Sequence, residues 1–285
     1  MTSSIAPTTT DSTEASQWVR RARSHSKSAS WIKQPLRIVV AFGCVIVIWL
    51  ISVSFANEPV TFYPTPASVW SAAVSLWNHG MTPAYVGVSL ERWGLGIAIG
   101  VGAAIPVALL LSLSRLASAM VKPILNFFYS IVELAWIPLF VLWFGYTSIT
   151  IELSISYVVF FLVLYNTLVG IEQVSNSTVS ALRTLGARRW RLTREALLPG
   201  ALPNIITGVR LGAGYAWRSL IGAEMIAAHS GLGYLIFQAR ADQDTSATVV
   251  GMIIIGTLWL LIDSLYLRPI EKATVERWGL IGVSQ

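Results

Sequence analysis

Six ionisable side chains lie within, or at the edges of, the long apolar stretches of this 285-residue sequence: Glu133, Glu152, Arg210, Arg218, Glu224 and Asp263. A charged side chain at the centre of a membrane span costs about 3 kcal/mol or more unless it is paired or hydrated. Each of the six is therefore a candidate for a polar pathway or for an internal ion pair. Arg210 and Arg218 are separated by close to two helical turns, so they share one face of a helix.

The residue types that perform catalysis or bind metals are sparse. His25, His79 and His229 are far apart and lack the spacing of metal ligands, so no metal site is expected. The only cysteine, Cys44, lies in an apolar run, which excludes a disulfide within the chain. No G-x-x-x-x-G-K-[ST] occurs, so the chain has no Walker-type nucleotide site. We predict that the chain is not an enzyme, because no catalytic pair at matched depth stands out.

The composition indicates a membrane environment. Hydrophobic residues make up 54% of the chain and charged residues 12%, about half the charged share of soluble domains. Six stretches approach the roughly 20 residues that cross the hydrocarbon core: 36–55, 93–113, 124–145, 149–170, 205–228 and 247–267. The sequence therefore predicts an all-α integral membrane protein with about six transmembrane helices.

The positions of the basic residues give the orientation. On one side of the membrane, lysines and arginines are concentrated up to residue 37, at Arg115 and Lys122, in the segment 177–204 and after residue 267. The opposite side keeps only Arg92 and Arg240. Because positive residues are retained on the cytoplasmic side, we predict that both termini are cytoplasmic. No basic helix is interleaved with aromatic residues, so the net charge of +6 does not indicate nucleic-acid binding.

Two G-x-x-x-G patterns occur within predicted spans, at Gly96 and Gly100 and again at Gly208 and Gly212. Without side chains, helix backbones approach closely, so these faces are expected to pack against other helices or a second copy of the chain. Pro106 and Pro138 lie inside spans and are expected to kink them.

The segment Ser177–Asn204 is the longest predicted cytoplasmic loop and has a regular pattern. It predicts one short helix from Thr178 to Leu185, a turn at Gly186, and a second helix from Ala187 to Leu198 that Pro199 stops. Glycine at the turn permits a left-handed backbone. Two interpretations remain open from these residues: a docking element for a partner protein, or a basic helix resting on anionic membrane lipid.

The same loop resembles the EAA signature of binding-protein-dependent ABC importer permeases. The resemblance rests on Ala181, on Gly186, and on the closing pair Leu198 and Pro199. The chain departs from the signature at Ser180, Leu182 and Ala196. In that family the loop forms coupling helices that dock into a cleft of the cytoplasmic ATPase. The residues to which the resemblance assigns this role are Ser180, Ala181, Leu182, Gly186, Ala187, Leu198 and Pro199.

Further segments, in the family's order between residues 60 and 275, resemble its nitrate, sulfonate and taurine branch. They are Tyr63-Pro64-Thr65-Pro66 with Val69-Trp70, Ile137-Pro138-Leu139 with Leu142-Trp143-Phe144-Gly145, Asn166-Thr167 with Gly170, and Ala223-Glu224-Met225 with Gly231-Leu232-Gly233-Tyr234. The resemblance implies the type I ABC importer transmembrane fold and a location in the bacterial plasma membrane. The expected organisation is a disordered basic tail at 1–35, a first helix and external loop at 36–92, a core domain at 93–270, and a cytoplasmic tail at 271–285.

The resemblance also implies a function and partners. It implies a permease subunit, forming a homodimer, that translocates a small sulfonate-, taurine- or nitrate-like anion delivered by an external solute-binding protein. ATP and Mg would be bound by a separate ATPase subunit, and no cofactor by this chain. Two alternatives stay open: an ATP-independent secondary carrier, and an ABC importer for an aromatic acid or vitamin precursor.

The charged residues of the predicted core are the candidates for the translocation pathway: Glu133, Arg210, Arg218 and Glu224. A competing interpretation places Glu133 in a salt bridge with Arg218, and we favour it over a role in substrate choice. Pairing with Glu224 would similarly explain the two arginines without a pathway role.

Overall fold

The computed structural model describes residues 43–44, 46–54 and 63–277, and the chain divides into two units, Met1–Thr65 and Pro66–Gln285. In the first unit, residues 43–44 and 46–54 are helical, in agreement with the predicted first span. The predicted tail 1–35, the remainder of the span 36–55, and residues 278–285 lie outside the described residues.

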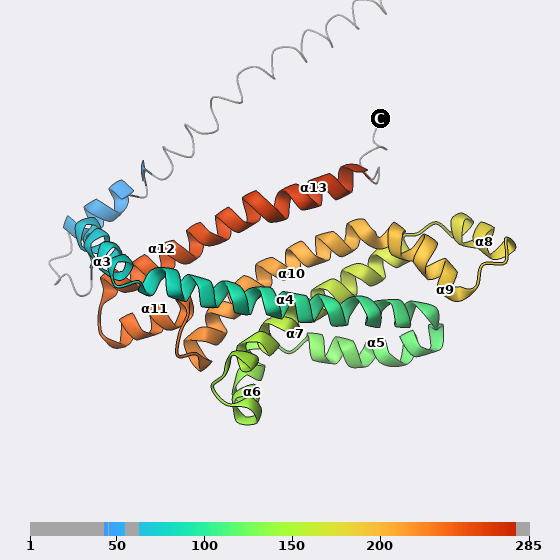
Figure 1. Cartoon of the computed structure of the whole chain (residues 1–285), viewed down its shortest axis with the longest axis horizontal. Helices are drawn as coiled ribbons and strands as arrows, with labels where there is room; N and C mark the ends of the chain where they lie inside the picture. The colour runs from blue at the N-terminus through green and yellow to red at the C-terminus, as the bar shows by residue number, and fades with distance from the viewer. Residues whose placement is uncertain (1–42, 45, 55–62, 278–285) are drawn as a thin grey trace, which may run out of the picture. The chain divides into compact units, whose positions relative to one another are not determined.

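The described part of the second unit consists of helices joined by short turns (Figure 1). Its elements are α3 (Pro66–Asn78), α4 (Met81–Leu113), α5 (Arg115–Tyr129), η1 (Glu133–Trp136), α6 (Ile137–Phe144), α7 (Ser148–Glu172), α8 (Asn176–Thr184), α9 (Arg189–Leu192), η2 (Thr193–Leu197), α10 (Leu198–Ala227), α11 (Leu232–Ala241), α12 (Thr245–Ile262), η3 (Asp263–Leu267) and α13 (Arg268–Arg277). No strand occurs among these residues, so the all-α prediction is confirmed for them.

Among the described residues, three continuous helices are long and apolar enough to cross a membrane: Met81–Leu113, Ser148–Glu172 and Thr245–Thr274. Two bent pairs raise the number to five if each pair counts as one span: Leu116–Tyr129 with Glu133–Phe144, and Trp190–Ala227 with Leu232–Ala241. With the predicted first span, this arrangement agrees with the expectation of about six.

The predicted span 124–145 is not one helix. The chain turns by 85° between Leu116–Tyr129 and Glu133–Phe144, and the extended backbone of Val132 separates the two parts. Pro138 lies in the first turn of α6, where a helix needs no N–H donor. Proline thus begins a new helix here instead of kinking a continuous one. At Pro106, by contrast, α4 continues through the proline.

The predicted external loop before residue 93 is also largely helical. It contains α3, and α4 already begins at Met81. The earlier part of α4 includes Glu91 and Arg92, whose charges obscured the helix in the sequence. Arg92 is buried and is accommodated through its ion pair with Glu224, at 3.0 Å.

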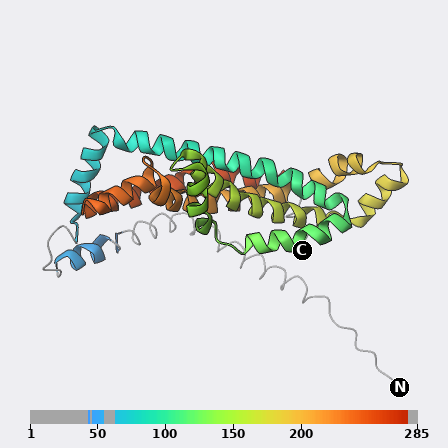
Figure 2. The same cartoon turned by 90° about the horizontal axis from the view of Figure 1, so that it is seen from below.

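Helix α7 occupies the centre of the second unit, with α4 and α10 running beside it (Figures 1 and 2). Its side chains Ile155, Val159, Val163 and Leu164 are fully buried in the largest hydrophobic core of the described residues. Helices α8 and α9 lie at one end of this bundle, here called the loop end, and α3 and α11 lie at the other.

The glycine pairs make this packing possible. A Cβ atom added to Gly100 would lie 2.7 Å from the Cβ of Val159 and 2.8 Å from the carbonyl oxygen of Ser156. On the other side of α7, a Cβ at Gly208 would lie 2.7 Å from the Cβ of Asn166. Both G-x-x-x-G faces therefore contact helix α7 of the same chain, as the prediction of packing against other helices allowed.

Substitution of Gly100 by alanine tests this packing. We expect Gly100→Ala to destabilise the purified protein by about 1–3 kcal/mol, because the added methyl group overpacks a backbone contact. The matched control is Gly102→Ala in the same helix, where an added Cβ meets nothing within 4 Å. Thermal unfolding in detergent should give a lower midpoint for the first variant and an unchanged or higher one for the second. Equal midpoints would contradict the close approach of α4 and α7.

Candidate functional site

The basic loop forms a helix, a tight turn and a second helix. In α8, the Ser175 hydroxyl accepts a hydrogen bond from the backbone N–H of Thr178 at 3.4 Å and caps the first turn. Gly186 follows with φ of +78°, the left-handed conformation that the sequence predicted for it. The short helix α9 then begins at Arg189.

The predicted stop at Pro199 is wrong. Helix α9 continues through the π-helical turn η2 into α10, and Pro199 lies in the first turn of α10. The wider π turn has a different hydrogen-bonding register, so the missing N–H of proline can be tolerated at the junction. The loop is therefore continuous with the longest part of the bent pair Trp190–Ala227 and Leu232–Ala241.

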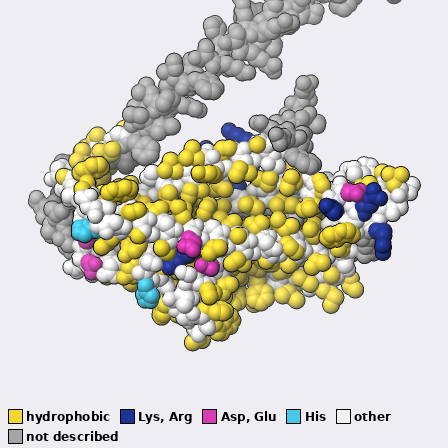
Figure 3. Space-filling model, in the orientation of Figure 1, with side chains coloured by type: hydrophobic (Ala, Val, Ile, Leu, Met, Phe, Trp, Pro, Cys, Tyr) yellow, Lys and Arg dark blue, Asp and Glu magenta, His cyan; other side chains and the backbone are white. Residues whose placement is uncertain are grey.

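Exposed apolar side chains flank the glycine turn. Leu185 is 80% exposed and Trp190 is 70% exposed, while Ser180 and Ala181 are exposed on α8. Leu182, Ala187 and Leu198, also assigned to this site from the sequence, are partly buried, as is Pro199. Figure 3 shows Lys and Arg side chains gathered at this end of the molecule, beyond a broad hydrophobic middle. A charged rim around exposed apolar groups is typical of a protein-binding surface.

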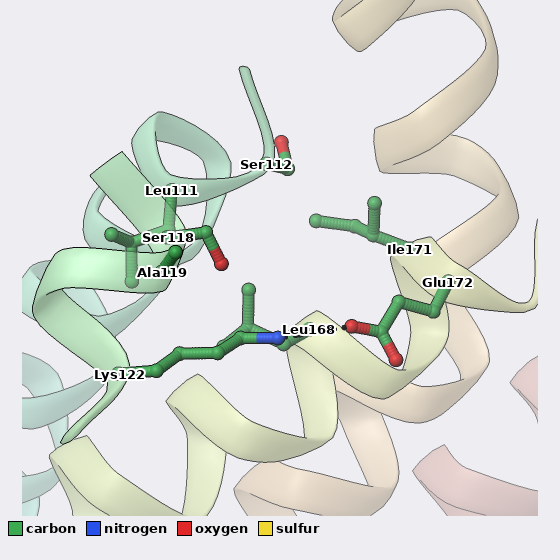
Figure 4. Close-up of a pocket in the computed structure, with 8 residues that line it drawn as sticks. All are labelled: Leu111, Ser112, Ser118, Ala119, Lys122, Leu168, Ile171 and Glu172. Atoms are coloured by element: carbon green, nitrogen blue, oxygen red, sulfur yellow. Dashed lines mark hydrogen bonds and ion pairs between the residues drawn. The ribbon is translucent and has the colours of Figure 1, made fainter. Parts of the chain in front are cut away.

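A hollow of about 440 Å³ lies beside the loop end, between the start of α5 and the end of α7. Lys122 of α5 points across it to Glu172 of α7, and their charged groups are 3.2 Å apart (Figure 4). Leu111 and Leu168 line it with apolar side chains. Both charged side chains are largely exposed, so this pair contributes little to stability.

Glu224 is fully buried and belongs to a polar network near the other end of α10. Its carboxylate is 3.0 Å from the Nη1 atom of Arg92, and both of its oxygens lie 2.9 Å from the Ser89 hydroxyl, which donates its one proton to them. It also accepts a hydrogen bond of 2.9 Å from the backbone N–H of Gly233. The Ser89 hydroxyl in turn accepts from the N–H of Leu232 at 2.9 Å. Two N–H groups at the start of α11 are thus satisfied by side chains from α4 and α10.

Arg92 extends the network to two further segments. Its Nη1 atom donates to the carbonyl oxygen of Ser230 at 2.6 Å, and its Nε atom donates to the Ser148 hydroxyl at 3.1 Å. Gly231 has φ of +117° and lies against the Glu224 carboxylate, where any side chain would collide. The network therefore joins α4, the start of α7, α10 and the turn into α11.

Arg210 of α10 belongs to a second cluster of charges, which it forms with residues of η3 and α13. Its Nη2 atom is 3.2 Å from Asp263, and its Nη1 atom pairs with Glu271. Arg268 also pairs with Asp263, at 2.7 Å. The π turn η3, which begins at Asp263, places this carboxylate toward α10.

The favoured salt bridge between Glu133 and Arg218 is absent from the described part of the chain. Neither side chain forms an ion pair there. The guanidinium of Arg218 lies 5.6 Å from the centre of the Tyr215 ring, and Glu133 lines a hollow at the break between α5 and α6. Pairing of Arg210 or Arg218 with Glu224 is likewise not observed, because Glu224 pairs with Arg92.

Arg92 and Ser89 are site residues that the sequence analysis missed, since Arg92 was assigned to an external loop. A signal for them was present. Ser89, Arg92, Gly96 and Gly100 recur at helical spacing, so they share the face of α4 that meets α7 and α10. Extending the glycine face backward by two turns would have placed Arg92 inside the protein.

A double-mutant cycle on Arg92 and Glu224 tests the buried network. We expect Arg92→Met or Glu224→Leu alone to destabilise the protein by about 3–5 kcal/mol, because either leaves a buried charge without its partner. The double variant should lose less than the sum, with a coupling of about 1–3 kcal/mol.

The matched control for this cycle is the exposed pair Lys122 and Glu172, for which Lys122→Met and Glu172→Gln should each cost about 1 kcal/mol or less. Thermal unfolding in detergent measures both cycles. Additive effects at Arg92 and Glu224 would show that the two side chains are not coupled.

Comparisons with known proteins agree with this architecture. The family model described as "Binding-protein-dependent transport system inner membrane component" matches residues 96–268. The chain is 31% identical over 252 residues to the putative aliphatic sulfonates transport permease protein SsuC of Bacillus subtilis, a match covering 88% of this chain and 90% of the relative. It is 29% identical to the taurine transport system permease protein TauC of Escherichia coli, covering 87% and 93%.

The bicarbonate transport system permease protein CmpB of Synechococcus elongatus is 30% identical, with 67% of each chain covered. Among solved structures, a chain of the MetNI methionine ABC transporter matches with a TM-score of 0.58 and 19% identity, covering 66% of this chain and 93% of that one. At this identity the match shows the type I ABC importer permease fold. The chain thus belongs to the family of binding-protein-dependent transport system inner membrane components, as the permease subunit of an ABC importer.

Proposed function

We propose that this permease translocates a small anion of the sulfonate, taurine or nitrate type, delivered by an external solute-binding protein. The observation that carries this proposal is the set of relatives, which are named for aliphatic sulfonates, taurine and bicarbonate and match along most of the chain. An importer for an aromatic acid or vitamin precursor is the alternative. The family membership does not favour an ATP-independent carrier.

The loop 177–204 is the proposed docking element for the ATPase. Its glycine turn and its exposed Leu185 and Trp190 support this role, because they offer a compact apolar surface that a cleft can enclose. ATP and Mg are bound by that partner, since this sequence lacks a phosphate-binding loop. Closure of two ATPase subunits would move two such loops together and switch the pathway from one side of the membrane to the other.

Two permease copies are proposed to form a homodimer with all termini in the cytoplasm. The charge distribution supports this orientation, because basic side chains gather in the loop 177–204. The exposed face of α10 that carries Tyr215 and Arg218 supports a path between two copies, since Arg218 is not expected to face lipid.

The four proposed pathway residues differ in how freely they can face a solute. Glu224 is fully buried with Arg92, and Arg210 is held by Asp263 and Glu271, so their pairs favour a structural role. Glu133 and Arg218 form no ion pair in the described part of the chain and remain the proposed groups of the pathway.

Substitution of Gly186 by valine tests the docking role. An added Cβ meets nothing within 4 Å there, but φ of +78° is unfavourable for a β-branched residue by about 1–2 kcal/mol or more. The turn should open and displace Leu185 and Trp190. We expect the tagged variant to retain about a tenth or less of the ATPase that co-purifies with the parent protein, and to lose solute-stimulated ATP hydrolysis after reconstitution.

The control is Gly80→Val, which lies between α3 and α4, has φ of +68° and also has open space around an added Cβ. It imposes the same kind of strain away from the loop and should leave ATPase binding unchanged. If Gly186→Val still co-purifies with the ATPase at the parent level, the loop is not the docking element.

A further inference from the structure

The break between α5 and α6 creates a hollow of about 210 Å³ with an acidic and aromatic lining. Glu133 contributes the acid, and Tyr129, Tyr157, Phe161 and Tyr215 contribute rings. The ring centres of Tyr157 and Phe161 are 5.0 Å apart, and those of Tyr129 and Phe161 are 5.8 Å apart. Three rings thus form one packed cluster beside a carboxylate.

The lining is held in place by the surrounding helices. The Tyr157 hydroxyl donates a hydrogen bond to the carbonyl oxygen of Phe128, which ties α7 to the end of α5. Next to Glu133, Leu134 packs so closely on α10 that a Cβ at Gly222 would lie 2.9 Å from its Cδ2 atom. The walls of the hollow are therefore positioned before any ligand binds, which lowers the entropy lost on binding.

The Glu133 carboxylate has no hydrogen-bond or ion-pair partner among the residues that the structure describes. Inside a membrane protein, a carboxylate without a protein partner requires water or a cation. Carboxylates and the faces of tyrosine rings both attract ammonium groups. A cationic group on the transported solute fits next to this carboxylate, whereas an anionic group in the same position would be repelled by it.

A positive charge lies next to the hollow, on the adjoining turn of α10. Tyr215 lines the hollow, and the Arg218 guanidinium is 5.6 Å from the centre of its ring. Arg218 is exposed and unpaired within the described residues. The hollow thus has a carboxylate in its lining and a guanidinium beside one of its rings.

From this arrangement we infer that the hollow is a solute site for a small zwitterion, an aminoalkanesulfonate, whose ammonium group binds Glu133 and the tyrosine rings. The sulfonate group is oriented toward Arg218. This inference rests on the proposed function, since it assigns the substrate class of the same pathway. Glu133 then acts as a specificity residue within the membrane, because it disfavours sulfonates that lack an amino group.

The test compares taurine, which carries both charges, with ethanesulfonate, which lacks the ammonium group. Saturation-transfer NMR on the full chain, purified in detergent, reports weak binding of either compound without the ATPase or the binding protein. We expect taurine to bind about tenfold more tightly than ethanesulfonate. In Glu133→Gln the difference should fall to about twofold or less, because taurine alone loses its partner. Arg218→Gln should weaken both compounds.

The matched control is Glu172→Gln, an exposed glutamate at the loop end that should leave the taurine preference unchanged. Equal binding of the two compounds to the unaltered protein would overturn the inference, as would an undiminished preference in Glu133→Gln or the absence of binding by both. The first and last of these outcomes need no variant, so a folding defect cannot obscure them.

Failure here is distinguishable from failure of the proposed function. A permease that retains its ATPase through the Gly186 turn but shows no preference for taurine keeps its importer role and loses only this substrate class. A permease that recruits no ATPase, yet prefers taurine through Glu133, keeps the solute site and loses the docking assignment.

Discussion

Helices in a lipid environment gain little from hydrophobic burial against one another, so their association depends on close contact. In this chain that contact is made by missing side chains on either side of α7. Gly96 and Gly100 of α4 lie against Ile155 and Val159 of one α7 face, and Gly208 of α10 lies against Asn166 of another. These contacts fix α4 and α10 against α7, and the other helices of the second unit pack on or follow these three.

The packing of α4 and α10 on α7 also positions the buried ion pair of these two helices. Close approach of α4 and α10 brings Arg92 and Glu224 within 3.0 Å, where each buried charge is compensated by the other. Toward the loop end, Arg210 reaches Asp263 and Glu271 and connects α10 to the last helices. Helix α10 is thus bound at two levels, and its exposed face between them carries Tyr215 and Arg218. Neither of these side chains forms an ion pair with the described residues.

Much of this architecture was predictable, because apolar stretches of about 20 residues and the alternation of basic loops are direct consequences of membrane insertion. The turn at Gly186 followed from backbone preference alone. The break after Tyr129 was not predictable, because Pro138 fits the first turn of a new helix as well as a kink in a continuous one. The packing of Leu134 on α10 is a contact between distant segments, which the sequence does not show.

Charged residues were the other source of error. The predicted external loop extended to Arg92, because an isolated arginine is costly inside a span. Its partner Glu224 is distant in the sequence and cannot be assigned from spacing. The same limitation produced the incorrect pairing of Glu133 with Arg218. Local hydrophobicity and backbone preferences predicted most helices, whereas contacts between distant segments determine which charged side chains are paired inside the protein.

The π turn at Thr193–Leu197 gives α10 an uninterrupted connection to the loop. The 30 residues of α10 form a rod of about 45 Å at the usual helical rise, so a tilt of about 5° at the loop would move the far end by about 4 Å. Glu224 and the turn into α11 lie at that far end. The chain thus has a mechanical lever that can amplify a small rotation on one membrane face into a displacement on the other.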